Sequence, residues 1–183
     1  MFLFQSSIKR YFQLLCENSS PYLLNLSASD IYSLHRPSFC ERRIFLQSRG
    51  EPAAEPGDFD KLLDELGKRH EAKHLSTFSE YEDLRGGSVD ERIARTAHVL
   101  ENGAEAIYLG VLEACLPGMS DHVRGIPDFL IKDGDSYRIR DCKLARHADE
   151  ENHEEMLLQL QLYGWLFEMT FQKPPASLEV YLG

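Results

Sequence analysis

The stretch that decides the fold reads GIPDFLI at residues 125–131 and, after a short link, YRIRDCK at residues 137–143. Apolar and polar side chains alternate in both runs, as they do in a β-strand with one buried face. The link at residues 132–136 contains an Asp-Gly pair, which favours a tight reverse turn. Together the two runs predict a β-hairpin that carries Asp128 on its first strand.

The second strand of this hairpin brings two ionisable side chains to one face. Side chains two residues apart in a strand point to the same side, so Asp141 and Lys143 share a face and Cys142 points away from them. With Asp128, two carboxylates and one ammonium then converge beside the sheet. This set of groups suits a hard divalent cation with a lysine next to it. An exposed hairpin held by salt bridges is the alternative interpretation.

Length and composition indicate one globular domain. The chain has 183 residues, of which 43% are hydrophobic and 27% charged, and this length is enough for a hydrophobic core. No apolar run is long enough to span a membrane. The opening MFLF is followed by Lys9 and Arg10, which is not the basic-then-apolar order of a secretion signal. We therefore expect a cytoplasmic protein without membrane contact.

The net charge of -10 argues against a protein that coats nucleic acid electrostatically. It leaves room for an enzyme with a local basic groove around an acidic site. The four cysteines, Cys16, Cys40, Cys115 and Cys142, are scattered and form no C-x-x-C pair. We expect them to be reduced thiols in an intracellular protein.

Periodicity and capping residues predict the elements around the hairpin. Helices are expected over 2–17, from Ser27 or Ser29 onward, and over 38–46, 58–75, 89–100 and 154–170. Strands are expected over 106–112 and 177–182, and loops over 50–57, 76–87 and 146–152.

Three of these segments carry further candidate residues. In the helix over 58–75, Leu62, Leu66 and His70 recur at helical spacing, which places His70 on or near the buried face; a satisfied core histidine is the alternative to a metal ligand. Arg42 and Arg43 are candidates for phosphate contacts, with a solvated helix face as the alternative.

In the helix over 154–170, Gln159 and Tyr163 lie one turn apart on one face. His147 and His153 have no partner at ligand spacing, so we expect them to be exposed to solvent.

His70 is followed by GIPD at residues 125–128, DCK at 141–143 and QLQLY at 159–163. This ordered series resembles the RecB-like branch of the PD-(D/E)XK nuclease superfamily, which includes exonucleases of recombinational DNA repair and nucleases of CRISPR spacer acquisition. The shared pattern is a helix histidine, G-x-P-D, D-x-K and Q-x-x-x-Y. The segment CERR at residues 40–43 resembles the upstream C-x-R part of that branch.

The resemblance implies an α/β fold with a restriction-endonuclease-like core, in which helices flank a mixed central sheet, forming a single nuclease domain over residues 1–183. It implies that His70, Asp128 and Asp141 ligate Mg²⁺ or Mn²⁺ together with the backbone carbonyl of Cys142. Imidazole is a softer ligand than carboxylate, which biases such a site toward Mn²⁺.

The same resemblance assigns the remaining roles. Lys143 would orient or deprotonate the attacking water, which is plausible chemistry because a nearby cation lowers the pKa of a lysine. Gln159 and Tyr163 would line the DNA strand and support the site. Arg42 and Arg43, the candidates for phosphate contacts named above, complete the expected DNA-binding residues.

One feature of the branch is incomplete here. Many members hold an iron–sulfur cluster through one upstream cysteine and three cysteines beyond the Q-x-x-x-Y helix. Cys40 matches the first of these, but no cysteine follows Tyr163. We expect no cluster within this chain. A longer parent protein, with a further C-terminal domain or a protein partner, is the alternative expectation.

The predicted function is metal-dependent hydrolysis of DNA, with DNA repair as its setting. No element that would read duplex bases is evident, so single strands or DNA ends are the expected substrate, as for an exonuclease. Two alternatives stay open. One is a non-catalytic nucleic-acid-binding or scaffolding module that keeps the nuclease fold, and the other is a phosphoesterase acting on small nucleotides.

Overall fold

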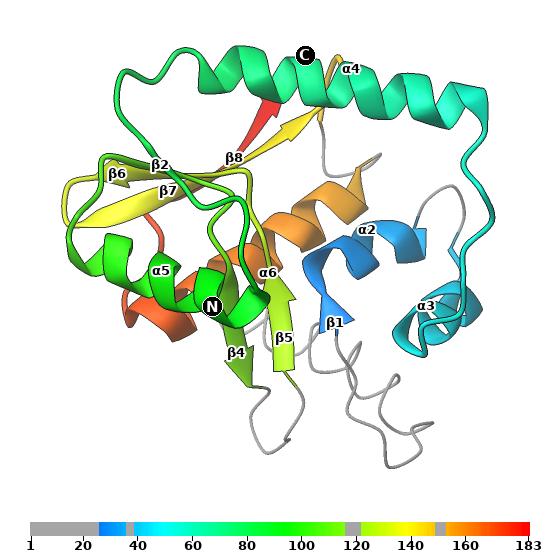
Figure 1. The fold of residues 1–183 in the computed structure, drawn as a ribbon, viewed down its shortest axis with the longest axis horizontal. Helices are drawn as coiled ribbons and strands as arrows, with labels where there is room; N and C mark the ends of the chain where they lie inside the picture. Colours follow the sequence, from blue (N-terminus) through cyan, green and yellow to red (C-terminus); the bar gives the residue numbers. More distant parts are fainter. Residues whose placement is uncertain (1–25, 36–38, 116–121, 149–152) are drawn as a thin grey trace.

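The computed structural model of the protein describes residues 26–35, 39–115, 122–148 and 153–183 (Figure 1). Its larger sheet has five strands in the order β2-β3-β6-β7-β8. The outer pairs β2–β3 and β7–β8 are parallel, and the inner pairs are antiparallel. The strands are Glu82–Asp83 (β2), Ala106–Tyr108 (β3), Phe129–Asp133 (β6), Ser136–Lys143 (β7) and Ser177–Leu182 (β8). This mixed sheet confirms the predicted fold class.

A smaller sheet has the order β1-β5-β4, formed by Leu26–Ser27 (β1), His122–Gly125 (β5) and Leu112–Cys115 (β4). The helices are Ala28–His35 (α2), Glu41–Ser48 (α3), Asp58–Leu75 (α4), Val89–Glu101 (α5) and Glu154–Phe171 (α6). Within the described ranges, none of these helices has the length and apolar character needed to cross a membrane. The helix predicted over 2–17 lies outside the described residues.

The five-stranded sheet lies between α4 on one side and α5 and α6 on the other (Figure 1). Strand alternation divides its side chains between two cores. Ile107, Leu130 and Ile139 are fully buried in the larger core, which α5 and α6 cover. Tyr108 and Phe129, their neighbours along the strands, belong to a smaller core on the side of α4. The sheet therefore presents a packed face in both directions.

The strand predicted over 106–112 is two strands in two different sheets. The chain turns at Leu109, whose φ of +55° ends β3. The N–H of Leu109 donates to the carbonyl of Asp128 at 3.0 Å, and the N–H of Val111 donates to Thr96 Oγ1 at 2.8 Å. Thr96 is thus fully buried on α5 because its hydroxyl serves this turn.

The predicted hairpin is present, with a shorter first strand. Its loop is the two residues Gly134 and Asp135, with Gly134 at a φ of +62° that favours glycine. The run over 125–131 is interrupted, because β5 ends at Gly125 and β6 begins at Phe129. Asp128 therefore stands in the bend before β6 and not within a strand, which corrects the sequence prediction.

Helix α4 has the predicted bounds but not the predicted buried face. Leu62 and Leu66 were expected on the buried face and are 50% and 40% exposed, respectively. The buried residue of α4 is His74, near the other end of the helix. The N-terminal half of α4 extends past the edge of the sheet, which explains why its leucines find no core (Figure 1).

Candidate functional site

The hairpin brings the two predicted acids together. Phe129 pairs with Arg140 between β6 and β7. Asp128, just before Phe129, therefore lies beside Asp141, just after Arg140. The backbone N–H of Cys142 donates a hydrogen bond of 2.6 Å to Asp128 Oδ2. Asp141 is only 3% exposed. A carboxylate from the bend before β6 and a buried carboxylate from β7 therefore lie side by side.

Lys143 lies beside these acids and is held by three groups. Its Nζ is 2.7 Å from Asp141 Oδ2, and it donates a hydrogen bond of 2.9 Å to Gln159 Oε1 on α6. The same ammonium lies 4.9 Å from the centroid of the Tyr32 ring on α2. The position of the ammonium is thus fixed by β7, α6 and α2 together.

Gln159 and Tyr163 continue this network away from the lysine. Gln159 Nε2 donates to the Tyr163 hydroxyl at 3.0 Å, and that hydroxyl donates to the carbonyl of Ile126 at 3.3 Å. Both side chains are buried. The network returns to the bend that carries Asp128, so it joins the D-x-K strand, the glutamine–tyrosine helix and the G-x-P-D segment.

The glycine of that segment has a packing reason. A Cβ added at Gly125 would lie 2.7 Å from Tyr163 Cδ1 and 2.7 Å from Leu166 Cδ1, closer than real contacts allow. Only glycine lets α6 approach the end of β5 this closely. The Tyr163 hydroxyl can then reach the carbonyl of Ile126.

The electrostatics of the site fit a bound cation. Burial, together with the charge of Asp141, raises the pKa of Asp128 to about 8. Burial also raises the pKa of Asp141, against the opposing attraction of the Lys143 ammonium. Two neighbouring acids, one buried and one half-buried, resist ionising together unless a cation compensates their charge. Asp128 and Asp141 would hold such a cation, joined by the Cys142 carbonyl.

His70, the predicted third ligand, is engaged by β8. Its Nε2 lies 3.1 Å from the carbonyl of Tyr181, and its ring stacks on the Tyr181 ring at 5.0 Å. Because a carbonyl only accepts, Nε2 carries the proton and Nδ1 is the nitrogen left for a cation. Nδ1 lies against Gly183, where an added Cβ would be 2.8 Å away.

Glu71 is the α4 residue whose charge reaches Asp128. It contributes to the raised pKa of Asp128 and, after burial and Asp128, to that of Cys142. It also hydrogen-bonds to Tyr108 and raises the pKa of that phenol, second to burial. Sequence patterns missed Glu71; the available signal was a carboxylate adjacent to the helix histidine.

The described part of the chain contains no group of three His, Cys, Asp or Glu side chains positioned to hold a metal ion. The two hairpin acids are together, and α4 supplies a third donor only if His70 or Glu71 turns toward them. The predicted four-ligand set is thus partly assembled in this conformation.

A second layer lies behind the acids, and sequence patterns did not indicate it. Arg140 pairs with Glu179 at 2.6 Å and donates to His74 Nε2 at 3.0 Å. The His74 ring stacks on Tyr181 at 3.8 Å and meets Phe129 at 4.9 Å. Burial and then the Arg140 charge lower the pKa of His74. A neutral, buried His74 therefore ties α4 to the sheet beneath the site.

The two predicted DNA-contacting arginines lie on α3 and differ in their surroundings. Arg43 donates from Nη1 to the carbonyl of Ser33 at 2.6 Å, which links α3 to α2. Arg42 is exposed to solvent. Arg43 therefore has a structural contact, whereas Arg42 faces outward.

The described cysteines are Cys40, Cys115 and Cys142, and all three are free of disulfides. Burial, then the Asp128 charge, raises the pKa of the Cys142 thiol. The thiol packs with the smaller core, as strand alternation predicted. The group that Cys142 offers toward the acids is thus its main chain.

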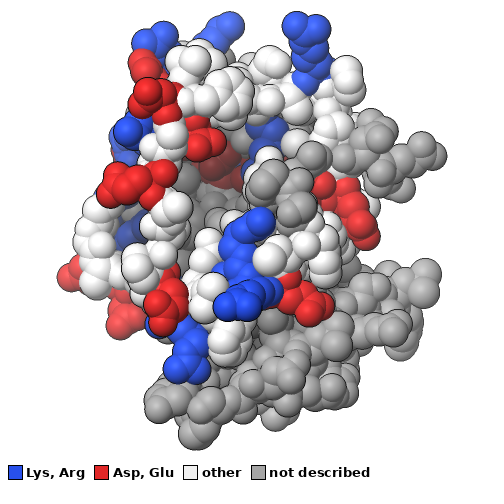
Figure 2. Space-filling model, turned by 90° about the vertical axis from the view of Figure 1, so that its right-hand side faces the viewer, with Lys and Arg blue, Asp and Glu red and all other residues white. Residues whose placement is uncertain are grey.

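The face of the molecule that Figure 2 shows is hollowed, and acidic side chains lie at the rim and at the back of the hollow. Lys and Arg side chains are grouped close beside it. An acidic centre with basic groups nearby suits a cation and a polyanion together.

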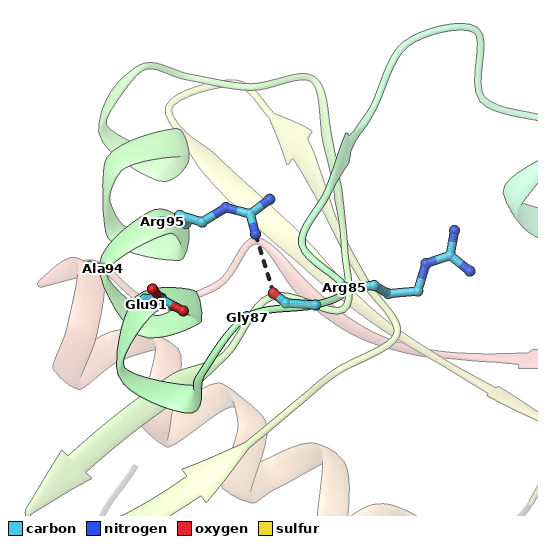
Figure 3. A pocket seen from close by; sticks show the side chains of 6 residues that line it. Arg85, Gly87, Glu91, Ala94 and Arg95 are labelled. Atoms are coloured by element: carbon cyan, nitrogen blue, oxygen red, sulfur yellow. Dashed lines mark hydrogen bonds between the residues drawn. The ribbon is translucent and has the colours of Figure 1, made fainter.

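A separate pocket of about 500 Å³ lies at the start of α5 (Figure 3). Its charged groups are matched within the chain. Arg85 pairs with Asp83 at 2.6 Å, Arg95 donates to the carbonyls of Asp83 and Gly86, and Glu91 caps α5. The lining contains none of the predicted site residues.

A mixed sheet between helices, with two acids and a lysine gathered at one hairpin, defines an α/β protein with an acidic, lysine-bearing centre. Residues 38–182 match the family model of the PD-(D/E)XK nuclease superfamily, and the chain belongs to this superfamily. Nucleases of this superfamily typically use divalent metals.

No curated protein matches the chain. Among solved structures, it is similar to the crystal structure of SSO0001, at 16% sequence identity and a TM-score of 0.38. The match covers 92% of this chain and 66% of that chain. The chain thus spans 66% of the length of that protein.

Proposed function

We propose that this protein is a Mg²⁺- or Mn²⁺-dependent deoxyribonuclease of the RecB-like branch, acting on single strands or DNA ends. The observation that carries the proposal is the position of Lys143 Nζ, between Asp141 Oδ2 at 2.7 Å and Gln159 Oε1 at 2.9 Å. The pairing with Gln159 joins D-x-K to Q-x-x-x-Y. These are two motifs of that branch.

Each polar group of the network has a role in this proposal. Asp128 and Asp141 would hold the cation, with the Cys142 carbonyl and His70 as further ligands. A bound divalent cation neutralises the phosphate and lowers the pKa of the attacking water. Lys143 orients that water and stabilises the negative charge that develops on the phosphoryl oxygens.

Gln159 and Tyr163 act through the lysine. The amide oxygen of Gln159 fixes the ammonium, and the amide nitrogen is fixed in turn by the Tyr163 hydroxyl. A lysine held at two points loses little freedom when the substrate arrives, which favours a productive geometry. Both residues also stand at the α6 side of the site, where the proposal places the DNA strand.

The experiment is degradation of an end-labelled single-stranded DNA by the purified protein, with Mn²⁺, Mg²⁺ or EDTA. We expect shortening of the label with either metal and none with EDTA. Asp128→Ala, Asp141→Ala and Lys143→Ala should each abolish cleavage while the melting temperature shows a folded domain. Lys173→Ala, an exposed lysine of the loop after α6, is the matched control and should retain full activity.

Binding of DNA without cleavage in either metal would reject the nuclease and favour a non-catalytic module. Turnover of mononucleotides with no loss of polymer would favour the small-nucleotide phosphoesterase. Cleavage by Lys143→Ala at the wild-type rate would remove this lysine from the mechanism.

A further inference from the structure

The outer face of α3 combines aromatic rings with guanidinium groups. Phe39, just before the helix, is 62% exposed, and Phe45 is 45% exposed. Arg42 stands between them in the sequence and is exposed. The guanidinium of Arg49 lies 5.6 Å from the centroid of the Phe45 ring. Flat apolar surfaces and positive charge thus share one face.

This face is held outward by the opposite side of the helix. Ile44 is fully buried in the larger core. Arg43 donates to the carbonyl of Ser33, and the N–H of Cys40 donates to the carbonyl of Leu34 at 2.9 Å. α3 is therefore anchored by a side chain buried in the larger core and by two hydrogen bonds to α2, while Phe39 and Phe45 are exposed.

Helix α2 connects this face to the candidate site. Ser33, which binds Arg43, follows Tyr32, whose ring lies 4.9 Å from Lys143 Nζ. α2 therefore contacts both α3 and the lysine of the candidate site. α3 lies at the end of the molecule that Figure 2 shows, where basic side chains are grouped beside the hollow.

We infer that this α3 face, defined by Phe39, Arg42, Phe45 and Arg49, is a stacking platform for the unpaired bases of a single-stranded nucleic acid. The inference rests on the proposed function, because the strand would pass from the platform to Lys143. Aromatic rings stack on any base that is not already stacked in a duplex, and arginines beside them contact the phosphates. The platform would hold the strand a few nucleotides from the cleaved bond.

A second exposed apolar face shows why the platform suits a polyanion. On α4, Phe59 is 69% exposed and lies near the exposed Leu62 and Leu66. Its neighbours in the sequence include Asp60 and Asp64, which would repel phosphates. On the α3 face, the charged residues near the exposed rings are Arg42 and Arg49. Phe59 is therefore a matched control: an equally exposed phenylalanine in acidic surroundings.

The test measures binding separately from cleavage. A fluorescent oligo-dT is titrated with the full chain in EDTA, and again in Ca²⁺, with fluorescence anisotropy as the readout. Phe39→Ala should weaken binding by about 5- to 150-fold, the range for loss of one base–aromatic stack. Phe39→Trp should retain binding, Phe39→Leu should not, and Phe59→Ala should bind as the wild type does.

Two further arms define the chemistry. A duplex of the same length should lose little affinity in Phe39→Ala, because its bases are already stacked. Arg42→Ala should weaken binding to both forms and reduce the dependence of affinity on salt. Equal melting temperatures would show that the variants fold alike.

Wild-type affinity for oligo-dT in Phe39→Ala and Phe45→Ala would overturn the inference and assign the face to a protein partner. Equal binding by Phe39→Leu and Phe39→Trp would also overturn it, since stacking would then not matter. If the chain fails to cleave DNA but Phe39→Ala loses oligo-dT, the platform stands and only the nuclease proposal fails.

Discussion

The backbone N–H of Cys142 donates a hydrogen bond of 2.6 Å to the carboxylate of Asp128. The bond runs from β7 to the bend before β6, so the main chain of β7 fixes the acid that this bend carries. An amide donor favours the ionised carboxylate and opposes the burial that raises its pKa. The position of the acid is therefore set before a cation binds.

The first prediction concerns pH and the stability of the metal-free protein. Asp128 ionises near pH 4 in an unfolded chain but keeps its proton to about pH 8 in the folded protein. Between these values the folded state binds the extra proton. Asp128 should therefore lower the free energy of unfolding as pH rises, by up to about 1.4 kcal/mol per pH unit.

The measurement is urea unfolding in EDTA from about pH 5 to about pH 8, for the wild type and Asp128→Asn. Subtracting the variant removes the contribution of other groups, including His74. The wild type should lose stability relative to the variant as pH rises. Parallel curves would show that Asp128 does not titrate in this way.

Gln159 should matter through the lysine that it holds. Gln159→Ala removes the acceptor of the 2.9 Å hydrogen bond from Lys143 and the donor to Tyr163. Loss of a buried hydrogen bond costs about 1–3 kcal/mol, so we expect cleavage to fall roughly 5- to 150-fold. Single-turnover cleavage at saturating protein measures this step. Gln161→Ala, half-buried two residues later, should stay near the wild-type rate.

Gly125→Ala should destabilise the protein. The new methyl group would meet Tyr163 and Leu166 at 2.7 Å, and overpacking of this kind costs about 1–3 kcal/mol. Thermal unfolding should show a melting temperature lower by several degrees. Gly67→Ala, within α4, is the control, because the nearest atom to its new Cβ would be Leu144 Cδ1 at 3.9 Å. It should gain about 0.5–1 kcal/mol from helix propensity, so two glycines should respond with opposite signs.

Cation affinity should depend on α4. His70→Ala should weaken Mn²⁺ binding on the order of 10- to 100-fold if the imidazole leaves Tyr181 to join the acids. Glu71→Gln should also weaken it, because it removes a negative charge that Asp128 senses. Calorimetric Mn²⁺ titration measures both, with the exposed His147→Ala as a control. An unchanged titration in His70→Ala would remove this residue from the ligand set.

The elements near the hairpin were the most predictable from the sequence. The bounds of α4 match the predicted 58–75, and α6 begins at the predicted Glu154. Both helices have several turns of consistent pattern, and the hairpin has an Asp-Gly turn between two alternating runs. Local chemistry alone sets such features. The side-by-side position of Asp128 and Asp141 follows from them.

Features that depend on distant contacts were not predictable. Nothing in the run 106–112 indicates that Leu109 adopts a positive φ, because the hydrogen bonds that hold it come from Asp128 and α5. The apolar spacing of Leu62 and Leu66 is typical of a buried face, but the sheet ends before it reaches them. Likewise, His74 is buried by Arg140 and Tyr181, which lie far along the chain.

The turn at Leu109 has a consequence for how proteins of this design could diversify. The chain leaves the five-stranded sheet there and returns at Asp128, and these two residues are joined by a hydrogen bond. The segment between them contains the paired strands β4 and β5, whose pairing begins with Leu112 opposite Gly125. The two strands form an arm that is closed at its base. Lengthening both strands equally would leave the base unchanged. Evolution could thus change the length of this arm, and with it the molecules that the arm contacts, while Asp128 and Asp141 keep their positions.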